Sequence, residues 1–248
     1  GGTAVHINAG AAGLALAIIL GKRVGWRKEA MRPHSLPLVM LGAALLWFGW
    51  FGFNAGSAVA SNGTAGLALL NTIGATTTAV LAWLLVEKIR DGHATSLGAA
   101  SGVVAGLVAI TPACAAVDAS GALIIGAVAG VLCALSVGLK FKFGYDDSLD
   151  VVAVHLVGGI VGTIMIGFVG VDVGLFIGGG TEQVVKQAIG AGAVLAYSFI
   201  ATLIIVFATG FLADSSIWMI LLITIIASMQ APFIALVVNS IAQNKVEG

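Results

Sequence analysis

Charged residues are scarce in this chain. Of its 248 residues only 9% are Asp, Glu, Lys or Arg, 59% are hydrophobic, and the mean hydropathy is +1.10. A soluble domain carries about 25% charged residues, and a chain of this length could not bury so much apolar surface in water. The scarcity of charge therefore excludes an ordinary soluble domain and favours a protein with several membrane spans.

Several chemical signatures are also absent. Cys114 and Cys133, the two cysteines, follow no metal or redox spacing and lie in apolar runs, which predicts small buried side chains. The net charge is zero, so no basic face favours nucleic acid. No GxxxxGK[ST] motif occurs, and no paired carboxylates or Ser/His/Asp set falls within the apolar runs. We therefore predict neither an enzyme nor a bound cofactor.

Long apolar runs are what the chain has instead. A membrane span needs about 20 apolar residues. The polar residues that separate the apolar runs predict helices at 1–20, 36–58, 65–87, 97–115, 121–141, 150–170 and 188–210. A further apolar run lies at about 215–240. Glycine pairs at four-residue spacing predict close helix packing in lipid; they are Gly52 and Gly56, Gly102 and Gly106, Gly126 and Gly130, and Gly158 and Gly162. The expected fold class is an all-α polytopic membrane protein.

The loops predict the orientation. The first, third and fifth loops hold nine of the eleven basic residues: Lys22, Arg23, Arg27, Lys28, Arg32, Lys88, Arg90, Lys140 and Lys142. The intervening loops near 60 and 115 hold none. Positive charge favours the cytoplasmic side, so the first, third and fifth loops are predicted to be cytoplasmic.

Two histidines lie within apolar runs in similar surroundings. Residues 4–7 read AVHI and residues 153–156 read AVHL, with four predicted spans between the two helices. The helices therefore run in opposite directions, as in inverted repeats of transporters. Either histidine could be a satisfied buried ring, but the pairing of His6 with His155 favours a functional reading. A neutral imidazole both donates and accepts hydrogen bonds, which suits a small polar solute or a proton relay. No third ligand lies in a span, so no metal site is predicted.

Aromatic and acidic residues mark two further places. WFGWFGFNAGSA (residues 47–58) is either an aromatic belt at the membrane interface, or a set of rings that attract a cation or gate a pore. Asp150 precedes His155 by five residues and is expected to cap that helix near the pore. Asp146 and Asp147 are expected to be solvated loop charges.

The segments GGTAVHINAGAAGL, WFGWFGFNAGSA, GLVAITPAC, GYDDSLD and DVVAVHLVGGIVG together resemble those of the ammonium transporter (Amt/Mep/Rh) family. The resemblance runs from Gly1 to about Phe207. It implies spans five to eleven of an eleven-helix inverted-repeat bundle, so that the chain begins inside span five. The expected division is a transporter domain at 1–210 and an apolar segment at 211–248, which departs from the family's polar tail and is a candidate extra transmembrane helix.

The resemblance also implies roles for individual residues. His6 and His155 match the twin pore histidines, Phe53 matches one of two gate phenylalanines, and Ser57 matches the serine of the outer recruitment site. Trp50 belongs to the same lining motif as Ser57. Thr111, in the TPAC turn, and Asp150 are expected to be structural residues near the pore.

The implied function is ammonium transport across the cell membrane. NH4+ would be recruited outside, deprotonated and conducted as NH3, with the proton following along the histidines as an open alternative. The implied partners are ammonium, methylammonium, membrane lipids and two further copies in a homotrimer; the PII-type regulator of the family is not favoured by the segment 211–248. Alternative readings are a permease for methylated amines or CO2, an ammonium sensor, and a chain that is inactive by itself.

Overall fold

The computed structural model describes residues 1–208, which form helices and no β-strand. The elements in chain order are a π-helix η1 (Thr3–Ile7), α1 (Asn8–Leu20), α2 (Leu36–Asn54), a 3₁₀-helix η2 (Gly56–Ala58), α3 (Gly63–Asp91), α4 (Ser96–Ile110), α5 (Ala119–Ser136), α6 (Leu139–Phe143), a π-helix η3 (Val152–Val157), α7 (Gly158–Val169), a 3₁₀-helix η4 (Leu175–Ile177) and α8 (Glu182–Ala208). The predicted segment 211–248 lies outside the described residues.

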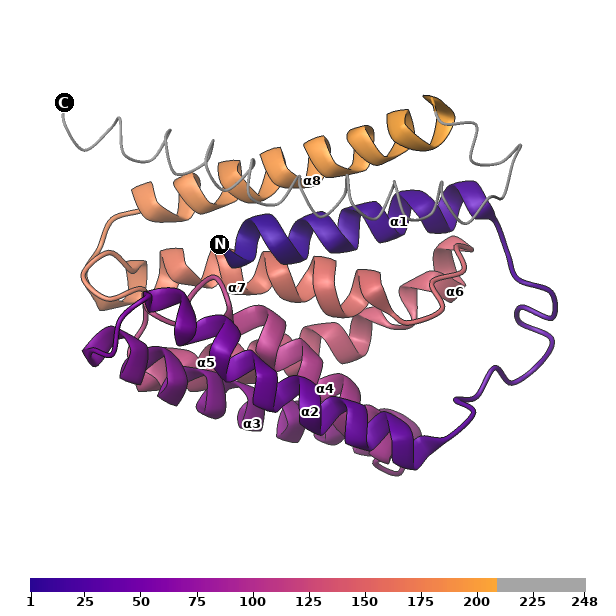
Figure 1. The fold of residues 1–248 in the computed structure, drawn as a ribbon, viewed down its shortest axis with the longest axis horizontal. Coiled ribbons are helices and arrows are strands. Elements are labelled where there is room, and N and C mark those ends of the chain that lie inside the picture. The colour runs from indigo at the N-terminus through magenta and orange to yellow at the C-terminus, as the bar shows by residue number, and fades with distance from the viewer. Residues whose placement is uncertain (209–248) are drawn as a thin grey trace.

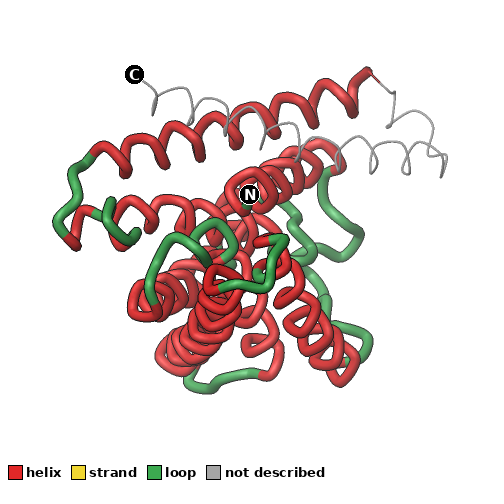
Figure 2. Tube along the Cα trace, turned by 60° about the vertical axis from the view of Figure 1, so that its left-hand side comes forward, coloured by secondary structure: helices red, strands yellow, loops and turns green. Residues whose placement is uncertain are grey.

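The long helices run side by side in a bundle (Figure 1). Within residues 1–208, six helical segments are long and apolar enough to cross a membrane: Thr3–Leu20, Leu36–Ala58, Gly63–Asp91, Ala119–Phe143, Val152–Val169 and Glu182–Ala208. Helix α3 packs against α4 and α5, while α8 packs against α1 and α7, and both views keep these as two neighbouring groups (Figures 1 and 2). The predicted all-α polytopic fold is confirmed.

Two predicted helices end earlier than their hydropathy indicates. The helix expected at 97–115 ends at Ile110, because Pro112 has no N–H to continue the ladder. Turns follow, in which Ala113 N donates to Ile110 O at 2.9 Å and Ala116 N to Ala113 O at 2.8 Å. The helix expected at 121–141 is divided into α5 and the short α6. Ala113, Cys114 and Val117 after α4 are apolar and buried, which explains why hydropathy alone does not detect the end of that helix.

Glycine allows backbones to touch at particular crossings. A Cβ at Gly126 would overlap the carbonyl of Ala75 on α3, and one at Gly162 would overlap the carbonyl of Ala109 on α4. Small residues let helix backbones approach closely in lipid, where van der Waals packing replaces hydrophobicity as the drive between helices. By contrast, Gly52 and Gly56 face no described atom within 4 Å. The predicted close packing is therefore confirmed in the α3–α4–α5–α7 group, whereas the described residues bring no backbone close to Gly52 in α2 or Gly56 in η2.

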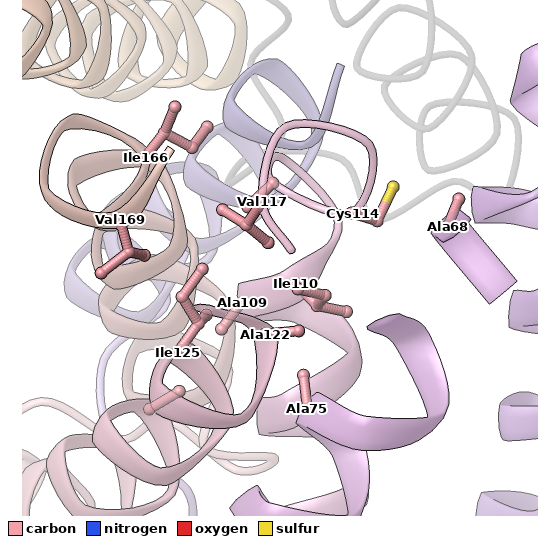
Figure 3. Packing of buried hydrophobic residues seen from close by; sticks show 12 residues of the cluster. Ala68, Ala75, Ala109, Ile110, Cys114, Val117, Ala122, Ile125, Ile166 and Val169 are labelled. Atoms are coloured by element: carbon pink, nitrogen blue, oxygen red, sulfur yellow. The ribbon is translucent and has the colours of Figure 1, made fainter. Parts of the chain in front are cut away.

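The core at the centre of this group consists of small and β-branched side chains. Figure 3 shows Ala75, Ile110, Ile125 and Ile166, which come from α3, α4, α5 and α7 and belong to one cluster of buried side chains. The cluster also includes residues of the turn that follows α4. Val117, in that turn, is fully buried within the same cluster. The turn after α4 is thus part of the packed core, which fixes its position relative to the neighbouring helices.

Candidate functional site

The two similar histidine segments fold in the same way. His6 lies in η1 and His155 lies in η3, and these are the π-helical turns of residues 1–208. Each π-turn leads directly into an α-helix, α1 or α7. A π-turn widens the helix locally and is frequent at functional sites. The similarity that the sequence indicates therefore extends to the backbone.

The structure brings the two imidazole rings together. Their Nδ1 atoms are 3.4 Å apart, and the ring centroids are 5.5 Å apart at an interplanar angle of 38°. His6 is only 3% exposed, whereas His155 is partly exposed. A neutral imidazole carries one N–H hydrogen, on either of its two ring nitrogens. A hydrogen bond between two Nδ1 atoms therefore requires one ring to donate and the other to accept. Which ring donates depends on the tautomer of each.

Close contact between the two helix starts holds the pair. A Cβ at Gly159 would lie 3.1 Å from Cβ of His6, and one at Gly10 would overlap the backbone of Leu156. These glycines each follow a histidine by four residues, one turn along the helix. The hydroxyls of Thr3 and Thr163 are 2.8 Å apart across the same contact. The crossing is therefore close because both helices lack a side chain where they meet.

Aromatic rings cover His6. The Trp50 indole stacks on it with a centroid distance of 5.4 Å and an interplanar angle of 17°, and Phe53 approaches edge-on at 6.4 Å. Trp50 is buried, and its Nε1 donates to the hydroxyl of Thr111 at 2.9 Å. Trp50 thus contacts both Thr111 and His6, whereas Ser57 lies in the exposed 3₁₀-helix η2 beyond α2.

Two cavities lie near the histidine pair: His155 lines one of them, and Phe53, whose ring contacts His6, lines the other. A cavity of about 500 Å³ is lined by Val5, Phe53, Ser57 and Thr111, among others. A second cavity of about 210 Å³ is lined by His155 with Ser101 and Leu149. The first lies towards the uncharged ends of the helices and the second towards the charged loops. The predicted site residues other than Asp150 therefore line these cavities or contact the residues that do.

The acidic residues before η3 differ from expectation. Asp146 and Asp147 were expected to be solvated, but both are buried. Asp146 accepts from Nε and Nη2 of Arg23 at 2.8 and 2.6 Å, and this guanidinium holds the pKa of Asp146 below its usual range. A bidentate arginine contact offsets the cost of burial, which is why a buried carboxylate is tolerated in this loop.

The helix cap is Asp147 and not Asp150. The Asp147 carboxylate accepts from the backbone N–H groups of Val151 and Val152 at 3.0 and 2.8 Å. Asp150 instead pairs with Lys140 at 2.6 Å and adopts a left-handed φ of 55°. Burial raises the pKa of Asp150. This backbone conformation turns its side chain away from the first helical turn, so that the expectation of a cap at Asp150 is wrong.

The described residues hold no group of three or more His, Cys, Asp or Glu side chains that could bind a metal ion. Cys114 and Cys133 are both buried and free within residues 1–208, and both lie in hydrophobic clusters. The prediction of small buried cysteine side chains is therefore confirmed.

Sequence reasoning missed three polar residues near the site. Asn54 Nδ2 donates to the Thr72 hydroxyl at 3.0 Å, and Asn71 Nδ2 donates to the carbonyls of Cys114 and Val117 at 2.9 and 2.8 Å. The sequence does offer a signal for Asn54, Asn71 and Thr72. Each is a polar side chain within an otherwise apolar span, where a polar group needs a hydrogen-bond partner.

Comparison with known proteins identifies the family. A family model for the Ammonium Transporter Family matches residues 1–217. The ammonium transporter of Mycobacterium tuberculosis is 63% identical over 217 residues, covering 83% of this chain and 46% of that protein. The ammonium transporter of Aquifex aeolicus is 50% identical over 211 residues, covering 83% and 49%. The chain thus spans about half the length of the curated relatives that it matches.

Solved structures of proteins named Mep2 and sensor Amt protein are similar to this chain. The crystal structure of Saccharomyces cerevisiae Mep2 matches with a TM-score of 0.78 and 36% identity, covering 84% of this chain and 51% of Mep2. A structure described as a sensor Amt protein matches with a TM-score of 0.76 and 30% identity, covering 84% and 54%. Both matches extend over most of the described residues, so that the bundle itself is what they share.

A second family model, described as fluoroquinolones export permease protein Rv2686c-like, matches residues 188–248. This range overlaps the end of the first match and covers a minor part of the chain. The first match covers most of the chain, and the relatives that it agrees with are transporters of the cell membrane and not enzymes. With its several membrane-spanning helices, the chain belongs to the Ammonium Transporter Family.

Proposed function

We propose that this chain supplies one half of a pore that conducts ammonium across the cell membrane, with neutral ammonia passing along His6 and His155. The observation that carries the proposal is the contact between the two imidazoles, whose Nδ1 atoms are 3.4 Å apart, with one cavity lined by His155 and another lined by Phe53. A pair of neutral rings offers both a donor and an acceptor to a small solute.

The outer cavity suits a small cation. The Ser57 hydroxyl donates to the Phe53 carbonyl at 2.6 Å, so its remaining lone pairs are free to accept from NH4+. Phe53 and Trp50, whose centroids are 5.4 Å apart, are aromatic, and aromatic faces attract cations. This arrangement supports recruitment of NH4+ at Ser57 and a gating role for Phe53.

Deprotonation provides selectivity. Moving an ion from water into apolar surroundings costs many kcal/mol, whereas NH3 is neutral and keeps its hydrogen-bonding capacity. NH4+ can release a proton before it passes Phe53, but K+ cannot. Passage of neutral NH3 with separate transfer of the proton therefore admits ammonium and excludes potassium.

Partners are part of the same proposal. Methylammonium has the same ammonium head and is the alternative substrate that tests the width of the pore. The homotrimer implied by the family would leave one pore in each subunit. A PII-type regulator is not favoured for this chain, because residues 211–248 are apolar in sequence where a polar tail is expected.

The test uses a full-length protein, made by joining this chain to the preceding half of the Mycobacterium tuberculosis relative and called the chimera below. Ammonium-evoked current and NH3 flux are measured in proteoliposomes, with K+ and methylammonium as comparators. We expect a saturable ammonium response that K+ does not evoke and that His6→Ala or His155→Ala alters. His93→Ala is the matched control, because His93 lies in an exposed loop.

A second candidate, ammonium sensing, is favoured by one observation, the match to a structure described as a sensor Amt protein. A sensor would bind ammonium without conducting it. If the chimera gives no flux above empty liposomes while ammonium still quenches its tryptophan fluorescence in a saturable way, transport is contradicted and sensing takes its place.

A further inference from the structure

Helix α2 contacts the described bundle through one narrow stripe. Its buried residues are Ala43, Trp50 and Asn54, spaced by seven and four positions, and most of its other side chains are exposed. Trp50 and Asn54 each donate a hydrogen bond to a threonine of another segment, Thr111 and Thr72. Within residues 1–208, α2 and with it the Trp50 ring are therefore held mainly along this stripe.

The Trp50 indole has two separate attachments. Its face stacks on the His6 imidazole, and its Nε1 donates to Thr111 Oγ1 at 2.9 Å. Stacking alone allows a ring to slide and turn within its plane, since the attraction depends weakly on such movement. The hydrogen bond at the ring edge removes that freedom, because it is directional.

The direction of hydrogen bonding at Thr111 is defined by its other partner. The Thr111 hydroxyl donates its one hydrogen to the carbonyl of Leu107 at 2.6 Å. Its oxygen can then only accept from Trp50, and an indole N–H can only donate. The two hydrogen bonds therefore run in one direction, with Trp50 donating to Thr111 and Thr111 donating to Leu107. Consecutive hydrogen bonds of this kind polarise and strengthen each other.

The turn that carries Thr111 is itself held firmly. Asn71 on α3 is fully buried, and its amide donates to the carbonyls of Cys114 and Val117 in that turn. The backbone that carries Thr111 is therefore fixed in position. The turn does not shift to compensate when the Thr111 hydroxyl is removed.

We propose that Thr111 is a positioning residue, whose hydroxyl holds the Trp50 indole flat against His6 and thereby keeps the His6 ring turned towards His155. Without the hydroxyl, the indole loses its edge attachment and the imidazole loses the flat surface that fixes its plane. This role rests on the proposed function of the histidine pair, although the ring positions themselves can be measured without any transport.

The test compares three variants. Thr111→Val removes the hydroxyl and keeps the shape, Thr111→Ser restores a hydroxyl, and Thr77→Val is the matched control. The Thr77 hydroxyl also bonds to a carbonyl four residues earlier, that of Ile73 at 2.8 Å, but it is exposed and no described group donates to it. Each variant is made in the chimera, labelled with ¹⁵N at tryptophan and histidine, and Trp50→Phe assigns the indole signal.

We expect Thr111→Val to move the Trp50 indole N–H signal and the His6 ring nitrogen signals, with Thr111→Ser close to the parent and Thr77→Val unchanged. In proteoliposomes Thr111→Val should lower the maximal ammonium rate on the order of tenfold, with the half-saturating concentration changed by less than about twofold, because a lost hydrogen bond of this kind corresponds to about a tenfold change in an equilibrium.

Three results would overturn the proposal. The first is an unchanged indole signal in Thr111→Val, which would mean that the hydrogen bond does not form. The second is an unchanged set of His6 signals despite a moved indole signal, and the third is an equal loss of rate in Thr77→Val. If the parent chimera conducts no ammonium, the proposed function fails separately, and the indole and His6 signals still decide whether Thr111 positions the rings.

Discussion

Asp146, Asp147 and Asp150 stand within five positions of one another, yet each carboxylate has a different partner. The first pairs with the Arg23 guanidinium, the second accepts from two backbone N–H groups, and the third pairs with Lys140. The backbone separates them, since only Asp150 has a left-handed φ. Identical side chains therefore contribute differently, and Asp147 alone supports the first turn of the helix that carries His155.

At Asp147 we expect a measurable loss of stability. Asp147→Ala removes the acceptor of two N–H groups at the start of η3, and loss of such a cap costs about 0.5–2 kcal/mol. Asp147→Asn keeps an oxygen acceptor and should lose less. Thermal unfolding of the chimera in detergent measures both. Ser148→Ala is the control, since Ser148 is exposed, and an equal shift in all three variants would contradict the capping role.

Contacts between helices depend on glycine at specific crossings and not on glycine in general. Gly162 on α7 faces the Ala109 carbonyl of α4, whereas Gly190 on α8 has no described atom within 4 Å of an added Cβ. Both are in helices of the bundle. The two positions thus separate the effect of packing from that of backbone freedom.

These two glycines should respond in opposite directions to the same substitution. Gly162→Ala forces the α4 and α7 backbones apart and should destabilise the protein by about 1–3 kcal/mol. Gly190→Ala should stabilise it by about 0.5–1 kcal/mol, because alanine loses less backbone entropy in a helix. Unfolding midpoints of the two variants provide the comparison, and destabilisation by both would mean that α8 is also closely packed at Gly190.

Sequence patterns predicted the elements well and their local geometry poorly. Hydropathy detected the spans because it measures transfer into lipid, and the repeated AVH tripeptide indicated that His6 and His155 belong together. Hydropathy could not detect the end of α4 at Ile110, because Ala113 and Val117 in the following turn are as buried as a helix interior. It also carries no information on hydrogen-bond register, so the π-turns were not predicted.

At the scale of the whole molecule the two ends of the bundle differ in charge. At one end Arg23 of the loop after α1 pairs with Asp146 of the loop before η3, and the Trp26 ring of the first of these loops stacks on Phe141 of α6 at 6.3 Å. At the other end Val171 N donates to the Ala116 carbonyl at 2.9 Å, and the nearby turns carry no basic residue. Of the three basic loops that the sequence assigns to one side, the first and the fifth therefore contact each other.

This separation of charge predicts which end faces the cytoplasm, and two valines test it. Val24 lies in the basic loop after α1 and is 99% exposed, while Val59 lies in the uncharged turn after α2 and is 91% exposed. Val24→Cys and Val59→Cys are made in the chimera with Cys114 and Cys133 replaced by alanine. Because basic loops stay on the cytoplasmic side, a membrane-impermeant thiol reagent added to intact cells should label Val59→Cys alone. Val24→Cys should react only after the membrane is opened, which provides its positive control.

Labelling of Val24→Cys from outside would reverse the predicted orientation. It would also exchange the outer and inner cavities on which ammonium recruitment at Ser57 depends.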